Sequence, residues 1–337
     1  SLAPQLTCYA RSVREADLMS HDEASTYLVK PLVGGPDGTT MLSAEEFHLL
    51  RRARFGVVGA VAIEHKLSIV LGNYIEFEQE LHSAVLHDTV YQRFDYSEMI
   101  DASYVLCRRL TNLLSSCRMY KDHVKHEIKM LYGRDSDCFN NTAAAFHNAY
   151  DSALSYRVME ALRNHAQHCD MPLHATGREW NLVETDAGPR SKRRIALNVN
   201  VRMLKEEGGF KKAVLDELDA IGGNDIDIKP MVREYIDAHW RVHIGIRTAM
   251  ATDIQVWTAA IQKRLDAMRV DYPKVETLGL TLLSLDDSDR VLTEDSLYPP
   301  FLDHFRKVLA RHTTAPELRH TFISSEVIND FPRMFKP

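Results

Sequence analysis

Cysteine is scarce in this sequence, and it has no long uninterrupted hydrophobic run. The five cysteines are scattered and form no Cys-x-x-Cys pair, which argues against a disulfide framework or a zinc ribbon and suits a reducing compartment. The most apolar stretch, 55–72, contains Glu64-His65-Lys66, three polar residues that a membrane span would not carry at its middle. No signal-peptide pattern opens the chain. We therefore expect a cytoplasmic protein that makes no membrane contact.

The sequence also lacks a strong excess of either charge. Its 337 residues include 41 lysines and arginines against 47 aspartates and glutamates, a formal net charge of −6. Any contact with nucleic acid therefore requires a local basic patch. With 45% hydrophobic and 26% charged residues, the composition is ordinary for a globular protein with one large domain or two smaller ones.

The first 42 residues are weakly patterned and contain a glycine-rich loop signal at 34–38. Ser43 then fits the N-cap of a short helix over 43–54. From 57 to 91, apolar residues recur at steps of three and four, which predicts one face of a long helix.

Two further helices are predicted downstream. A capping box that begins at Asp95 opens a second long helix, and Gly133 ends it. A third apolar stripe follows, from Ala143 to Ala161. The three stripes together predict an antiparallel helical bundle, with no strand of four or more residues between 57 and 165.

The pattern changes after Pro172. Alternation around Trp180 and Leu182, and again over 195–201, predicts two strands joined by a turn at 186–189. Three more helices are predicted, at 210–221, 230–268 and 300–311, and a third strand is predicted at 278–282. We therefore expect a mainly α protein made of an N-terminal extension (1–42), an antiparallel helical bundle (43–175) and a smaller α+β region with a short antiparallel sheet (176–337).

The most suggestive chemistry lies at the end of the third helix. Arg163, Asn164, His165 and His168 fall within two helical turns, and the inward stripe continues by spacing to both histidines. An arginine can hold a phosphate and an imidazole can move a proton near neutral pH, and neither step requires a metal.

The pattern Arg163-Asn164-x-x-x-His168 resembles the signature of the HEPN superfamily, an arginine followed four to six residues later by a histidine. The frequent form has asparagine directly after the arginine, as here. HEPN domains are helical bundles that are usually dimeric. Many are metal-independent ribonucleases of toxin–antitoxin, abortive-infection and RNA-processing systems. Asp170 stands where the toxin subgroup often has tyrosine.

This resemblance implies a metal-independent endoribonuclease that has no cofactor, acts in bacterial stress or phage defence, and forms a homodimer that a partner protein regulates. Arg163 would hold the phosphate, Asn164 would orient it or the imidazole, His168 would act as base or acid, and His165 would be the second proton carrier. The alternative is a non-catalytic helical module for dimerisation or protein interaction, in which the same face binds a partner.

A basic cluster follows the predicted turn, formed by Arg190, Lys192, Arg193 and Arg194. It is either a solvated turn or an electrostatic contact for RNA. The sequence contains no P-loop, no G-x-G-x-x-G after a strand and no G-x-S-x-G nucleophile motif.

Three other sets of residues have spacings found in metal sites. His87-Asp88 is typical of metal-dependent phosphohydrolases, for which His65 and Asp151 would complete the metal shell. His239 and His243 have the i, i+4 spacing of a metal clip, but they continue an apolar stripe, which favours core or interface histidines. A di-iron bundle needs more than the single unit Glu45-x-x-His48.

Overall fold

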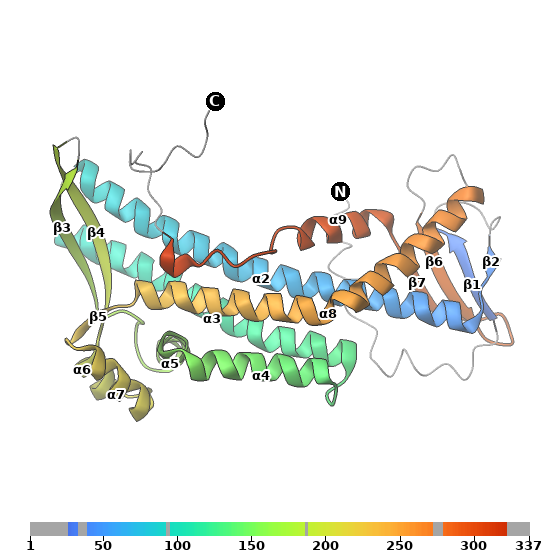
Figure 1. Ribbon diagram of the computed structural model, residues 1–337, viewed down its shortest axis with the longest axis horizontal. Coiled ribbons are helices and arrows are strands. Elements are labelled where there is room, and N and C mark those ends of the chain that lie inside the picture. The colour runs from blue at the N-terminus through green and yellow to red at the C-terminus, as the bar shows by residue number, and fades with distance from the viewer. Residues whose placement is uncertain (1–25, 33–38, 92–94, 186–187, 272–278, 322–337) are drawn as a thin grey trace.

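The structure is a computed structural model that describes residues 26–32, 39–91, 95–185, 188–271 and 279–321. It is mainly helical, with two small antiparallel sheets, as the sequence predicted. Long helices run along the longest axis of the molecule, a four-stranded sheet lies at one end and a β-hairpin at the other (Figure 1). The loop predicted at 34–38 lies outside the described residues.

The first long helix, α2 (Ala44–Tyr91), includes the predicted short helix at 43–54. The prediction of two helices was wrong because α2 has no chain break between them, and its buried glycines, Gly56 and Gly59, keep helical geometry. Its start is as predicted, since the hydroxyl of Ser43 accepts a hydrogen bond from the Glu46 amide at 3.1 Å.

The second long helix, α3 (Tyr96–Tyr132), has both predicted ends. The Asp95 carboxylate accepts a hydrogen bond from the Ser97 amide at 2.8 Å. Gly133 ends the helix with a positive φ of 84°, and its amide donates to the Lys129 carbonyl. Helices α2 and α3 pack against each other along their length.

The third predicted helix is two helices, α4 (Asp137–Ser152) and α5 (Leu154–His168). Ala153 separates them because its backbone is extended (φ −131°, ψ 122°). The prediction of one continuous helix from Ala143 to Ala161 was therefore wrong. Among the described residues between 57 and 165 there is no strand, which confirms the prediction for this part of the chain.

A late helix completes the bundle. Helix α8 (Lys229–Asp271) begins with Pro230 in its first turn and packs against α2, α4 and α5. Its buried face, which includes Tyr235, Ile246 and Trp257, shares one continuous hydrophobic core with the earlier helices. The chain after residue 176 thus supplies a central helix to the bundle.

The four-stranded sheet joins the two ends of the described chain. Its order is β2-β1-β6-β7, and all neighbours are antiparallel. The strands are β1 (Thr26–Pro31), β2 (Thr40–Met41), β6 (Leu280–Leu285) and β7 (Val291–Leu297). The predicted third strand corresponds to β6, whereas β1, β2 and β7 were not predicted. Helix α9 (Pro299–Leu309) follows and packs on α2, and a short 3-10 helix, η1 (Leu318–His320), contacts α8.

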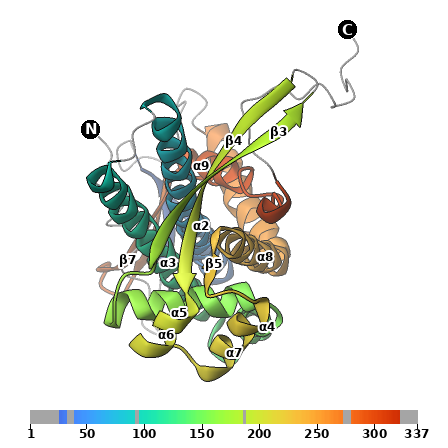
Figure 2. The ribbon, with the colours of Figure 1, turned by 90° about the vertical axis from the view of Figure 1, so that its left-hand side faces the viewer.

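The predicted hairpin is present as β3 (Ala175–Thr185) and β4 (Gly188–Asn200). Its two strands cross the end of the bundle, and their paired tips reach past the helices (Figure 2). Strand β5 (Asp225–Asp227) pairs with the far end of β4. Two short helices lie between β4 and β5, α6 (Val201–Glu207) and α7 (Lys212–Ile221). Residues 186 and 187 of the predicted turn lie outside the described residues.

Among the described helices, α2 is long and apolar enough to cross a membrane by length and composition alone. Half of its most apolar segment is buried inside the molecule, and core helices of soluble proteins can be as long and as apolar. The buried polar residues Glu64 and Glu78 lie on this helix and bind partners within the molecule. The structure is thus compatible with a soluble protein.

Candidate functional site

The motif residues lie in the last two turns of α5, which packs its other face against α3 and α8. Leu162 and His165 point into the molecule, whereas Asn164, Gln167 and His168 are exposed. The prediction that both histidines face inward was therefore wrong for His168, because the helix ends at this residue and its side chain is exposed in the described part of the chain.

Arg163 is drawn toward the exposed face of α5. Its Nη1 donates a hydrogen bond to Oδ1 of Asn164 at 3.0 Å. Asn164 and His168 stand one turn apart on that face. Within the described chain, the guanidinium of Arg163 contacts no carboxylate, and the imidazole of His168 makes no hydrogen bond. Nε of Arg163 is buried without a hydrogen bond in the described chain, but its Nη1 reaches the exposed Asn164, one turn before His168.

His165 lies in different surroundings. Its ring is fully buried, 6.0 Å from the Phe210 ring centroid, and its Nε2 lies 3.2 Å from the carboxylate of Glu207. The same carboxylate oxygen lies 3.2 Å from Nε2 of His174. The structure therefore brings His165 together with Glu207 and His174 and does not bring it to the exposed surface that carries His168.

His165, His174 and Glu207 offer possible metal ligands within 4.8 Å of one another. However, Nδ1 of His174 accepts a hydrogen bond from the Asn200 amide at 3.0 Å, so in the neutral ring the proton sits on Nε2. That proton points to Glu207 at the position where a metal would need a lone pair. This arrangement fits a hydrogen bond from His174 to Glu207, beside the buried ring of His165, better than a metal site.

A second buried cluster lies between α2, α8 and the segment after α9. Glu64 is at its centre: Oε2 lies 2.8 Å from Nδ1 of His312, and Oε1 lies 3.1 Å from Nε2 of His243. The hydroxyl of Tyr120 lies 2.9 Å from Nδ1 of His243. Two histidines and one carboxylate are a ligand set that several transition metals use.

Arg247 provides a positive charge beside Glu64, which argues against a metal ion in this cluster. Its Nε lies 3.1 Å from Oε1 of Glu64 and balances the charge of the carboxylate. A divalent cation would add two positive charges beside the buried Glu64 carboxylate, which Arg247 already neutralises, at a high desolvation cost. The cluster is therefore a charge-balanced network that ties three segments together.

The charges of this network follow from its burial. Burial raises the pKa of Glu64, but hydrogen bonds from His243 and His312, together with the nearby Arg247, outweigh burial and lower the pKa to about 2. Burial lowers the pKa of His243, which favours its neutral form. Glu64 is therefore ionised, while His243 remains neutral with its Nε2 beside the carboxylate.

The other predicted core histidine, His239, is also buried. Its ring stacks on Tyr156 with centroids 5.2 Å apart, and Nδ1 lies 3.0 Å from the carbonyl oxygen of Tyr235. Burial lowers its pKa to about 4. Both His239 and His243 are thus buried core histidines, as the apolar stripe predicted.

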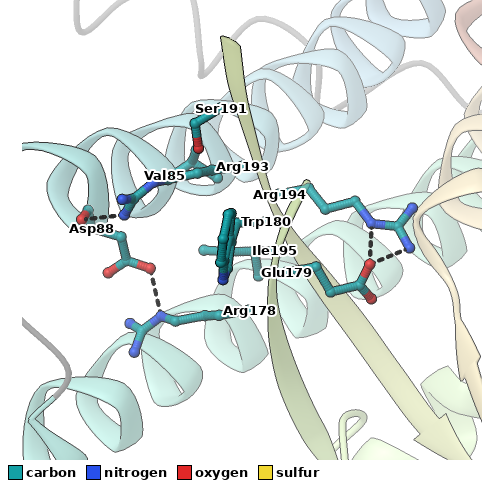
Figure 3. A pocket seen from close by; sticks show the side chains of 9 residues that line it. All are labelled: Val85, Asp88, Arg178, Glu179, Trp180, Ser191, Arg193, Arg194 and Ile195. Atoms are coloured by element: carbon teal, nitrogen blue, oxygen red, sulfur yellow. Dashed lines mark hydrogen bonds and ion pairs between the residues drawn. The ribbon is translucent and has the colours of Figure 1, made fainter. Parts of the chain in front are cut away.

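The basic cluster lies wholly on β4, beside a pocket of about 320 Å³ between the hairpin and the end of α2 (Figure 3). Arg194 pairs with Glu179 across the hairpin at 2.6 Å, and Arg193 donates to the Asp88 carbonyl at 3.0 Å. Arg190 and Lys192 stand nearer the tip on the same strand. Part of the cluster therefore holds the hairpin in place.

The pocket also shows the structural role of Asp88. Nε of Arg178 lies 2.5 Å from the Asp88 carboxylate, so this acid anchors the hairpin to α2 (Figure 3). His87 is exposed, with its ring 4.6 Å from Tyr91. The geometry around His87-Asp88 gives no support to a metal-dependent phosphohydrolase site.

Sequence reasoning missed Glu64, Glu207 and His312 as partners of the buried histidines. Glu64 was visible only as a polar interruption of an apolar stretch. No local spacing connects it to His312, because the two belong to opposite ends of the chain.

Comparison with known proteins found no matching family model, no similar curated protein and no similar solved structure.

Proposed function

We propose that this protein is a metal-independent endoribonuclease of the HEPN type, with Arg163, Asn164 and His168 at its site. The observation that supports this most is the hydrogen bond from Arg163 to Asn164, which draws the guanidinium to the exposed face that carries His168. A cation without a carboxylate partner in the described chain, next to an imidazole without a hydrogen bond there, is suited to bind an anionic ligand.

In this proposal the 2′-hydroxyl of RNA attacks the adjacent phosphorus, and the bond to the 5′-oxygen breaks. His168 takes the proton of the 2′-hydroxyl or gives a proton to the leaving 5′-oxygen. Arg163 stabilises the charge that develops on the phosphate oxygens, and Asn164 orients the phosphate or the imidazole. DNA lacks the 2′-hydroxyl and resists this reaction.

The position of His165 changes its expected role. Because its ring is fully buried against Glu207 and Phe210, it positions the end of α5 rather than carrying a proton to RNA. The second proton carrier would then be His168 of a second copy, which a homodimer with facing α5 ends would bring close. Light scattering that detects only a monomer would remove this composite site.

The hairpin is the proposed contact for the rest of the RNA. Arg190 and Lys192 lie near its tip, and Trp180 on the paired strand is 66% exposed, so a base can stack on it. Regulation by a partner protein and a place in bacterial stress or phage defence belong to the same proposal and depend on the resemblance. A cytoplasmic location also belongs to it and depends on the scattered cysteines and the interrupted apolar stretch.

The test is cleavage of single-stranded RNA in excess EDTA. The expected products end in a 2′,3′-cyclic phosphate or a 3′-phosphate. His168→Ala and Arg163→Ala should each lower the rate about 10²- to 10⁴-fold. Gln167→Ala is the matched control, since Gln167 is exposed on the same turn and has no assigned role.

Full activity in both site variants would overturn the assignment. Activity that EDTA abolishes would point to a metal site instead. A folded dimer that cleaves no RNA in a broad panel would favour the non-catalytic interaction module.

A further inference from the structure

A second pocket, separate from the α5 motif, lies between α3, α4 and the start of α7. It has a volume of about 430 Å³ and opens to solvent. Three lysines line it: Lys121 and Lys125 from α3, and Lys211, the N-cap of α7. The pocket also contains Phe146, His147 and Tyr150 from α4.

Aromatic rings hold the three ammonium groups around this pocket. Nζ of Lys125 lies 5.7 Å from the Phe146 ring centroid, and Nζ of Lys211 lies 5.7 Å from that of Tyr150. Nζ of Lys121 lies 5.7 Å from the ring of Tyr156. Cation–π contacts stabilise these positions but provide no negative charge.

The neighbouring acids neutralise the lysines only in part. Glu160 lies 3.6 Å from Lys121, but it also contacts Arg118 at 3.7 Å and accepts a hydrogen bond from Tyr235. Two further acids, Asp122 and Asp151, pair with Arg118 and His147 respectively. In the described part of the chain, no carboxylate lies within 4.0 Å of Lys125 or Lys211.

The charged form of Lys125 is disfavoured in this pocket. It is half-buried, and burial, together with the charge of Lys121, lowers its pKa. A bound anion would relieve both effects, because it would provide the hydrogen-bond acceptors and the negative charge that the pocket lacks.

We propose that this lysine pocket binds the phosphate group of a phosphate monoester. A monoester is a dianion with three terminal oxygens, which matches a surplus of positive charge that comes from three lysines. A phosphodiester has one negative charge and a substituent on either side, so it suits a one-sided pocket less well. This site does not depend on the proposed ribonuclease activity.

Isothermal titration of the full chain with inorganic phosphate, AMP and the dinucleotide ApA tests the proposal. Phosphate and AMP should bind, and ApA should bind at least tenfold more weakly than AMP. Lys125→Gln and Lys211→Gln should each weaken AMP binding about ten- to a hundredfold, the effect of losing one hydrogen bond to a charged group. Circular dichroism should show both variants folded, and Lys125→Arg should restore most of the affinity.

The matched control is Lys129→Gln. Lys129 is exposed one turn further along α3 and does not line the pocket, so this variant changes the net charge equally and should bind AMP as the wild type does. Equal losses in Lys125→Gln and Lys129→Gln would show non-specific attraction and overturn the proposal. So would the absence of binding to both phosphate and AMP. ApA binding as tight as AMP binding would reassign the pocket to the RNA backbone.

Discussion

The carboxylate of Glu64 lies 2.8 Å from Nδ1 of His312, a residue 248 positions further along the chain. Arg247 joins the same carboxylate and also donates from Nη2 to the carbonyl of Leu309 at 2.7 Å. These bonds fasten the end of α9 to the centre of the helical bundle. Most of this network is buried, so each of its polar groups depends on the others.

Glu64→Gln should destabilise the protein strongly. The amide cannot neutralise Arg247, and leaving one partner of a buried ion pair uncompensated costs about 3–5 kcal/mol. Urea denaturation measures the loss of unfolding free energy. Glu206→Gln is the control, because its pair with Arg202 is exposed and should contribute only about 0–1 kcal/mol. Similar small losses in both variants would contradict the buried network.

Stability should fall as the pH decreases below about 6.5. Burial lowers the pKa of His239 from 6.5 to about 4, so the unfolded chain takes up a proton first and unfolding becomes easier between these values. Glu64, lowered from 4.5 to about 2, gives a further loss as the pH falls through that lower window. Thermal unfolding from pH 4 to 8 measures the first effect.

His239→Phe keeps a ring against Tyr156 and removes the titrating group. The pH slope of stability between 6.5 and 4 should then decrease by up to about 1.4 kcal/mol per pH unit. The exposed His147 provides the control, and His147→Gln should retain the slope. An unchanged slope in His239→Phe would mean that His239 is not buried as a neutral ring.

Two glycines of α2 should respond in opposite directions to alanine. A Cβ on Gly56 would lie 2.3 Å from Cδ2 of Trp257, so Gly56→Ala forces α2 and α8 apart and should cost about 1–3 kcal/mol. Gly72 has nothing within 4 Å of the same position, and Gly72→Ala should add about 0.5–1 kcal/mol through helix propensity. Stabilisation by both substitutions would disprove the close contact of the two helices.

Asp88→Ala should release the hairpin from α2. The carboxylate is the anchor of Arg178, so its loss should speed hydrogen exchange at the amides of β3 and change the fluorescence of Trp180 while the bundle stays folded. Glu179→Gln removes only the exposed pair with Arg194 and should leave exchange nearly unchanged. Equal protection in all three proteins would show that Asp88 does not hold the hairpin.

The helices were predictable because their signals are local. The caps at Ser43 and Asp95, the glycine stop at Gly133 and the apolar stripes all act within a few residues. Strand β1 was not predicted because its six residues show no clear alternation of apolar and polar side chains. In addition, β6, the strand that pairs with it, lies far along the chain. The break between α4 and α5 at Ala153 could not be predicted from this residue, since alanine favours helices.

The same contrast applies to the site. The exposed face with Asn164 and His168 follows from helix spacing once the end of α5 is known. The partners of the buried histidines do not, because Glu207 reaches His165 from α6 and His312 reaches Glu64 from beyond α9. These contacts depend on tertiary packing, on which the spacing of residues in one helix carries no information.

The order of the four-stranded sheet has a consequence for synthesis on the ribosome. Val29 of β1 pairs with Leu282 of β6, which leaves the ribosome 253 residues later. At about 5–20 residues per second, that delay is roughly 10–50 s. During this time β1 has no neighbour on the edge that β6 later covers, and an unpaired edge attracts other strands. Nascent chains of this protein should therefore need a chaperone until β6 emerges, even though the α2–α3 pair can form much earlier.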